Sequence, residues 1–169
     1  MALDSTPGGP SANSYATTDE ADAYFYGSKA TTWGAADSSA KEASLIEATR
    51  LLDRFFDWSG DIVQDSTQSL RWPRTGAYDA DDRLIDPTIV PVPVKQATIE
   101  WALLLMQGGP FEITDNELSV AKVGPIRLEF RNGVNQSSFP KMVIDILNPI
   151  GYLKTISDSG IYQAKLVRA

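Results

Sequence analysis

Cysteine and histidine are both absent from the 169 residues of this chain. The lack of cysteine excludes disulfides, thiolate zinc sites and cysteine nucleophiles. The lack of histidine excludes Ser-His-Asp triads, histidine-containing metal sites and an imidazole general base. Carboxylates with Mg²⁺, or a lysine, could still act, but no such group stands out. We therefore expect a protein that is not an enzyme and that needs neither a metal nor another cofactor.

Long apolar runs are also missing. The longest run spans residues 101–106, whereas a helix that crosses a bilayer needs about 20 apolar residues. The first ten residues carry no basic region and no apolar run, so they do not resemble a signal peptide. We expect no membrane contact, and a chain that works in the cytosol or within an assembly built there.

Positive charge is scarce. The chain has 15 basic and 22 acidic residues, a net charge of −7, and the first hundred residues hold 16 of the acids but only 8 of the bases. A protein that binds phosphates over an extended surface normally shows the opposite balance. The composition therefore argues against a nucleic-acid binder. The apolar share of 43% is enough for one packed domain of this length.

Helical signals dominate the part of the chain that we expect to be folded. Residues 1–14 are rich in Ser, Gly and Pro and predict a flexible arm. Thr17 and Glu20 have the spacing of a capping box, as do Ser39 and Glu42. The first box predicts a helix over about 18–26, and the second a longer helix to about residue 57. Proline and glycine positions bound two further helices, at about 93–107 and 140–149.

The period of the pattern changes after the third helix. Residues 118–123 and 126–131 alternate apolar and polar side chains around Gly124 and Pro125, which predicts a β-hairpin at about 118–131. Residues 150–169 are expected to form a C-terminal tail. The predicted fold class is mainly α: a small bundle of about four helices with a β-hairpin and extended terminal arms, with the helical domain at residues 15–149.

Two sets of side chains are candidate structural anchors or interface residues. The first lies near the long connection 60–92, and its aromatic and basic members either fasten that connection to the core or form a platform for single-stranded nucleic acid. It comprises Trp58, Leu70, Trp72 and Arg74. The second is a possible basic face of the hairpin, which a solvated strand would also produce. It comprises Lys122, Arg127 and Arg131.

Two other clusters have simpler interpretations. The acidic residues 79–82 lack the later ligands of a calcium-binding loop and predict a turn. Residues 24–26, Tyr-Phe-Tyr, are either an exposed docking patch or, as we expect, two core residues and one at the rim.

An ordered series of motifs over residues 14–131 resembles a family of small tailed-phage proteins. Leu-Arg-Trp-Pro-Arg at 70–74 is its most specific element, and the chain departs from the pattern at Asp82, where a turn glycine is typical. The other motifs are SYATTDEADAYF at 14–25, ATRLLD at 48–53, WSG at 58–60, IVP at 89–91, the helix around 97–102, VGP at 123–125 and the strand that ends at Phe130.

The resemblance is to head–tail connector, or adaptor, proteins, some of which are labelled DnaT-like single-stranded-DNA-binding proteins. It implies a structural neck protein of the virion, assembled in the bacterial cytoplasm as a ring of twelve copies. Its implied partners are the portal protein and tail or further neck proteins, with DNA passing through the ring without specific binding. The alternative is a single-stranded-DNA-binding replication protein.

Overall fold

The computed structural model describes residues 2–63, 67–108, 140–148 and 150–154. Within them the chain forms five helices and two small two-stranded sheets, so the mainly α fold class is confirmed. The predicted hairpin at 118–131 lies outside the described residues. None of the described helices has both the length and the apolar character that crossing a membrane requires.

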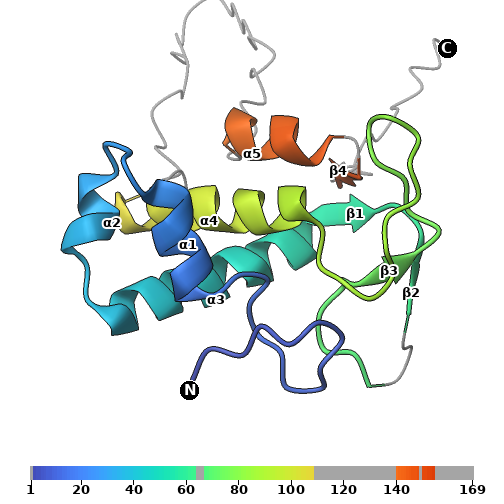
Figure 1. Ribbon diagram of the computed structural model, residues 1–169, viewed down its shortest axis with the longest axis horizontal. Helices are drawn as coiled ribbons and strands as arrows, with labels where there is room; N and C mark the ends of the chain where they lie inside the picture. The colour runs from blue at the N-terminus through green and yellow to red at the C-terminus, as the bar shows by residue number, and fades with distance from the viewer. Residues whose placement is uncertain (1, 64–66, 109–139, 149, 155–169) are drawn as a thin grey trace, which may run out of the picture.

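Three helices form the body of the fold. In Figure 1, α4 (Val92–Met106) lies between α3 (Ser38–Phe55) and α5 (Lys141–Leu147). The apolar stripe of α3 faces inward, and α4 and α5 complete the core from the other side. The fully buried side chains of these helices include Leu45, Leu52, Val94, Trp101, Val143 and Leu147.

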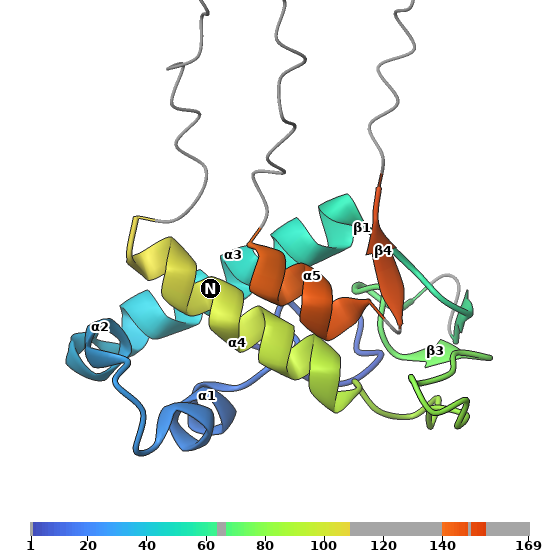
Figure 2. The same ribbon diagram turned by 90° about the horizontal axis from the view of Figure 1, so that it is seen from above.

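The remaining two helices cover one end of this body. The short helix α1 (Thr18–Phe25) packs against α3 and α4, and α2 (Thr31–Ala35) packs against α4 (Figure 2). α1 begins with the predicted capping box, because the Thr17 side chain accepts from the amide of Glu20 and the Glu20 carboxylate accepts from the amide of Thr17.

The start of α3 differs from the sequence prediction. Asp37, not Ser39, is the N-cap: its carboxylate accepts a 2.8 Å hydrogen bond from the amide of Ala40. Ser39 therefore lies inside the first turn. Asp37 and Ser39 are both residue types that cap helices well. The capping-box spacing between Ser39 and Glu42 was therefore not enough to identify the N-cap.

The two sheets lie at the opposite end from α1 and α2. β1 (Phe56–Trp58) continues directly from α3 and pairs antiparallel with β4 (Gly151–Leu153). β2 (Asp61–Ile62) pairs antiparallel with β3 (Arg74–Thr75). Phe56 and Trp58 point into the core, so the β1–β4 ribbon closes this end of the helical body (Figure 1).

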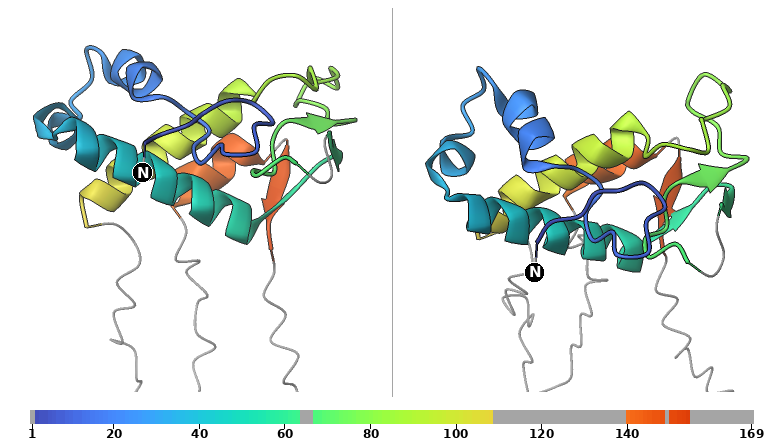
Figure 3. Two further views of the ribbon diagram at one scale, coloured as in Figure 1. Left: turned by 90° about the horizontal axis from the view of Figure 1, so that it is seen from below. Right: turned by 60° about the horizontal axis from the view of Figure 1, so that its bottom comes forward.

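The expected flexible N-terminal arm needs correction over residues 2–14, and the expected C-terminal tail over residues 150–154; the rest of that tail, 155–169, lies outside the described residues. Ser69 donates its hydroxyl to the carbonyl oxygens of Gly9 and Ala12, and Ala12 and Ser14 are buried. The segment before α1 is thus held along α3 and the 67–75 connection (Figure 3). At the other end, Ile150 is buried and residues 151–153 form β4. The low apolar content of these segments predicted flexible arms. Contacts with residues far away in the sequence nevertheless hold them against the rest of the fold.

Candidate nucleic-acid interface

The aromatic and basic cluster of the long connection is buried. Trp72 has no exposed surface and Trp58 is 7% exposed. Their rings meet edge to face with centroids 5.9 Å apart. A base cannot stack on a ring that solvent does not reach. The tryptophans therefore join β1 and the connection to the core, and they do not form the stacking platform that the sequence left open.

Arg74 is buried with the two tryptophans and serves the backbone. Its guanidinium donates to the carbonyl oxygens of Ser59, at 2.8 Å, and of Gly60 and Arg71. Leu70 is partly buried against the same core. Because the donors of Arg74 are committed to main-chain oxygens, the residue holds the turn between β1 and β2 and is not exposed to phosphate.

A partly buried carboxylate lies beneath this cluster, in the last turns of α3. Asp53 accepts from the hydroxyl of Tyr15 and, at 3.1 Å, from the amide of Arg71. Burial raises the pKa of Asp53, and burial with the neighbouring carboxylate raises the pKa of Tyr15 well above its usual value. The pair fastens the segment before α1 to α3 and to the long connection.

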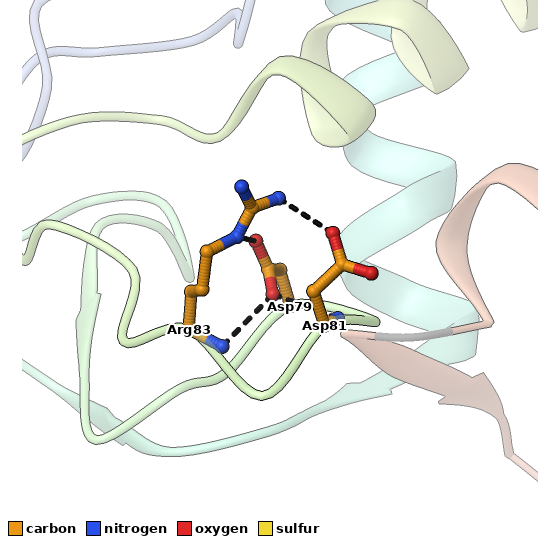
Figure 4. Close-up of polar contacts among 3 residues, drawn as sticks. All are labelled: Asp79, Asp81 and Arg83. Carbon is orange, nitrogen blue, oxygen red and sulfur yellow. Dashed lines mark hydrogen bonds and ion pairs between the residues drawn. The ribbon is translucent and has the colours of Figure 1, made fainter.

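The acidic loop at residues 79–83 is a self-contained turn. The Asp79 carboxylate accepts from the amides of Asp81 and Arg83, and the Arg83 guanidinium pairs with both carboxylates at 2.9 and 2.7 Å (Figure 4). The amide of Arg83 is the main cause of the lowered pKa of Asp79. Within the described residues no group of side chains could hold a metal ion.

Exposed aromatic rings occur instead at the two ends of the helical body. At the α1–α2 end, Tyr26 is 90% exposed and Tyr24 is 38% exposed, whereas Phe25 packs against the core. The expectation of two core residues and one at the rim was wrong, because α1 ends at Phe25 and Tyr26 lies beyond its inner face. The Tyr24 hydroxyl donates to Glu100, and burial together with this carboxylate raises the pKa of Tyr24 to about 12.

A groove of about 420 Å³ adjoins Tyr24 at this end. Its charged lining residues are Lys29 and Glu100, and Asp19 lies exposed in the first turn of α1. Aromatic surface is thus present at this end, but its charge is balanced or negative.

The other end carries an exposed ring among cations. Tyr152, in the middle of β4, is 63% exposed. Lys154 follows it by two residues and so lies on the same face of the ribbon. The ammonium of Lys154 donates to the carbonyl oxygen of Arg54 at 3.0 Å and lies 3.6 Å from the carboxylate of Asp57. The last turn of α3 and the outer face of β4 therefore form one surface.

Two arginines extend this surface. Arg54 is exposed at the end of α3, with its guanidinium 5.4 Å from the ring centroid of Phe55. Arg71 is exposed beside the same turn, where its amide contacts Asp53. We call the group Arg54, Arg71, Tyr152 and Lys154 the basic end of α3. It combines an accessible ring with three cations, the two components that single-strand binding uses.

Sequence reasoning missed this surface for an identifiable reason. Tyr152 and Lys154 fell in the segment expected to be a tail, and Arg54 was one polar residue on an amphipathic helix. Only the pairing of β4 with β1 brings them together. The other sequence candidates, Lys122, Arg127 and Arg131, lie outside the described residues.

A family model described as "Putative DnaT-like ssDNA binding protein" matches residues 1–169. No protein of curated function and no solved structure matches the chain.

This match corrects the functional expectation from the sequence. The main interpretation, a structural ring protein of the phage neck that lines the DNA passage, is contradicted, because the family that matches the whole chain is one of DnaT-like single-stranded-DNA-binding proteins. The match likewise gives no support to describing the chain as a virion protein or a head–tail connector. The finding agrees with the alternative that the sequence left open. The prediction from composition used the net charge of the whole chain and did not consider where its cations lie on the surface.

Proposed function

Because the chain belongs to the DnaT-like single-stranded-DNA-binding family, we propose that it binds single-stranded DNA. The observation that carries this proposal is the match of the family model to the full length of the chain, since a match of that extent covers the whole described fold. The function is one of binding and not of catalysis, in keeping with a sequence that has no histidine and no cysteine.

The geometry supports the proposal in one respect. Single-strand binders without sequence preference combine exposed rings, on which bases stack, with cations that contact the backbone. The basic end of α3 offers Tyr152 for the first task and Arg54, Arg71 and Lys154 for the second. Asp79 and Asp81 of the 79–83 loop are paired with Arg83, which lowers their repulsion of a nearby strand.

The proposal is tested by fluorescence anisotropy with a labelled oligothymidylate and a duplex of equal length. We expect binding of the single strand at low salt, weaker binding of the duplex, and affinity that falls as salt rises. With about three phosphate contacts the logarithm of the binding constant should change against the logarithm of salt with a slope of about −2. No anisotropy change for the single strand at low salt would overturn the proposed function.

A further inference from the structure

We propose that single-stranded DNA binds at the basic end of α3, with a base stacked on Tyr152 and the adjoining phosphates held by Arg54, Arg71 and Lys154. This inference rests on the proposed function and assigns it to a surface. It is the described surface where an exposed ring and a local excess of cations coincide.

The ring of Tyr152 is presented rigidly. Tyr152 stands opposite Asp57 in the antiparallel register, and β4 is anchored on both sides of it: the amide of Ser59 donates to Ile150, and the amide of Lys154 donates to Phe55. Gly151 lies opposite Trp58, where a Cβ would come within 2.8 Å of the indole ring. The strand is therefore seated directly on the buried tryptophan, and its outward ring loses little freedom when a base stacks on it.

The cations differ in how far they are committed to the protein. Arg54 and Arg71 are exposed, and the guanidinium of Arg54 lies over the ring of Phe55. Lys154 is already engaged with the carbonyl oxygens that end α3, at 3.0 and 3.5 Å, and with Asp57. A phosphate at Lys154 would compete with the Asp57 carboxylate. Asp57 thus opposes DNA binding at this surface, which gives the proposal a variant that should bind more tightly.

The α1–α2 end is the competing location, and charge decides against it. Tyr26 is the more exposed ring, but Lys29, the one cation among the described residues that line the neighbouring groove, is accompanied by Glu100 and by the nearby Asp19. Carboxylates at this range repel a phosphate backbone. The two ends therefore provide a matched pair of exposed tyrosines and exposed cations for an experiment.

The test uses the full chain and a labelled oligothymidylate in anisotropy titrations. Tyr152→Ala should weaken binding about tenfold, the loss expected for one stacked base. The matched control Tyr26→Ala should bind as the wild type does. Arg54→Ala should weaken binding and reduce the steepness of the salt dependence by about 0.7 in slope, whereas Lys29→Ala should leave both unchanged.

A variant that is expected to bind more tightly is also needed, because a loss of DNA binding could arise from unfolding of the variant. Asp57→Asn removes the competing charge at Lys154 and keeps the shape of the side chain, so we expect binding about two- to fivefold tighter. The thermal unfolding midpoint of each variant is measured alongside.

The outcomes separate the site from the function. If the wild type binds and Tyr152→Ala, Arg54→Ala and Asp57→Asn all leave its affinity unchanged, the site is wrong and the function stands. If Tyr26→Ala and Lys29→Ala weaken binding instead, the strand binds at the α1–α2 end. If the wild type does not bind the single strand, the proposed function itself fails, and the site fails with it.

Discussion

Gly60 is the position in the described chain where a single added carbon has the clearest cost. It has a φ of +72°, and a Cβ there would overlap the carbonyl oxygen of Thr75 and lie 2.8 Å from the amide nitrogen of Ala77. The same residue supplies a carbonyl oxygen to Arg74. The turn between β1 and β2 therefore requires glycine both for its backbone conformation and for close approach to β3.

We predict that Gly60→Ala lowers the free energy of unfolding by about 3 kcal/mol, which combines the left-handed conformation with the overlap. Gly27→Ala is the matched control, because Gly27 has a φ of +75° with no atom within 4 Å of the added carbon. It should lose only about 1 kcal/mol. Urea unfolding measures both; equal losses would show that the overlap at Gly60 is relieved by movement of β3.

Asp53 makes a prediction about pH. Burial raises the pKa of its carboxyl in the folded protein, whereas the unfolded value is about 3.9. Below that value the carboxyl is protonated in both states. As the pH rises from there through the raised folded pKa, the unfolded state loses the proton first, so the contribution of Asp53 to stability falls.

The asparagine of Asp53→Asn cannot ionise, so this variant lacks the pH-dependent contribution to the free energy of unfolding. The stability of the wild type minus that of Asp53→Asn should therefore decrease as pH rises through this window, as measured by urea unfolding at a series of pH values. A difference that grows with pH would mean that the hydrogen bonds from Tyr15 and Arg71 outweigh burial and that the folded pKa is lowered.

At the scale of elements, the start of α3 gives a test with its own control. We predict that Asp37→Ala lowers the free energy of unfolding by about 1 kcal/mol, because the amide of Ala40 loses its capping partner. Ser39→Ala, at the residue that the sequence pattern favoured, should change it by less than about 0.5 kcal/mol. A larger loss for Ser39→Ala than for Asp37→Ala would restore the sequence assignment.

The elements that the sequence predicts are those with a local cause. α1, α3, α4 and α5 follow from capping residues, proline positions and apolar periodicity, and the structure places each within a few residues of its predicted bounds. The five-residue α2 was not predicted: it has no side-chain cap and only one buried residue, Trp33. β1 and β4 have three residues each, too few for an alternating pattern to stand out.

The candidate site was less predictable than the fold. Trp72 and Arg74 stood out because tryptophan and arginine are informative residue types, but whether a tryptophan is buried or exposed depends on contacts from distant segments. Tyr152 and Lys154 were unremarkable until β4 was seen against β1. Accessibility is a property of tertiary packing, so residue type alone could not separate the anchors from the exposed ring.

At the scale of the whole molecule, β4 closes the core over β1. We predict that a chain ending at Asn148 unfolds at a markedly lower urea concentration than the full chain, because Phe56 and Trp58 lose their covering strand and the buried Ile150 is removed. A chain ending at Lys154 keeps β4 and its contacts to α3 and serves as the control. Equal midpoints for the two truncations would show that β4 contributes little to stability.

The distribution of charge matters more than its sum. The chain is acidic overall at −7, yet Asp79 and Asp81 of the 79–83 loop are paired with Arg83, and Asp53 is partly buried. Arg54, Arg71 and Lys154 remain at the opposite end from the α1–α2 groove. An acidic protein can therefore present a local surface suited to a polyanion, while its net charge limits binding elsewhere.

The pairing of β1 with β4 joins residues nearly a hundred positions apart in the sequence. A ribosome that adds about 5–20 residues per second needs about 5–20 seconds to supply β4 after it has made β1. During that interval α3 and its apolar stripe are complete, while Phe56 and Trp58 have no partner strand. The nascent chain therefore exposes the unpaired, apolar edge of β1 for longer than a helical domain with only local contacts would. The rate of translation and the presence of chaperones should accordingly affect how much of this protein reaches the folded state in a cell.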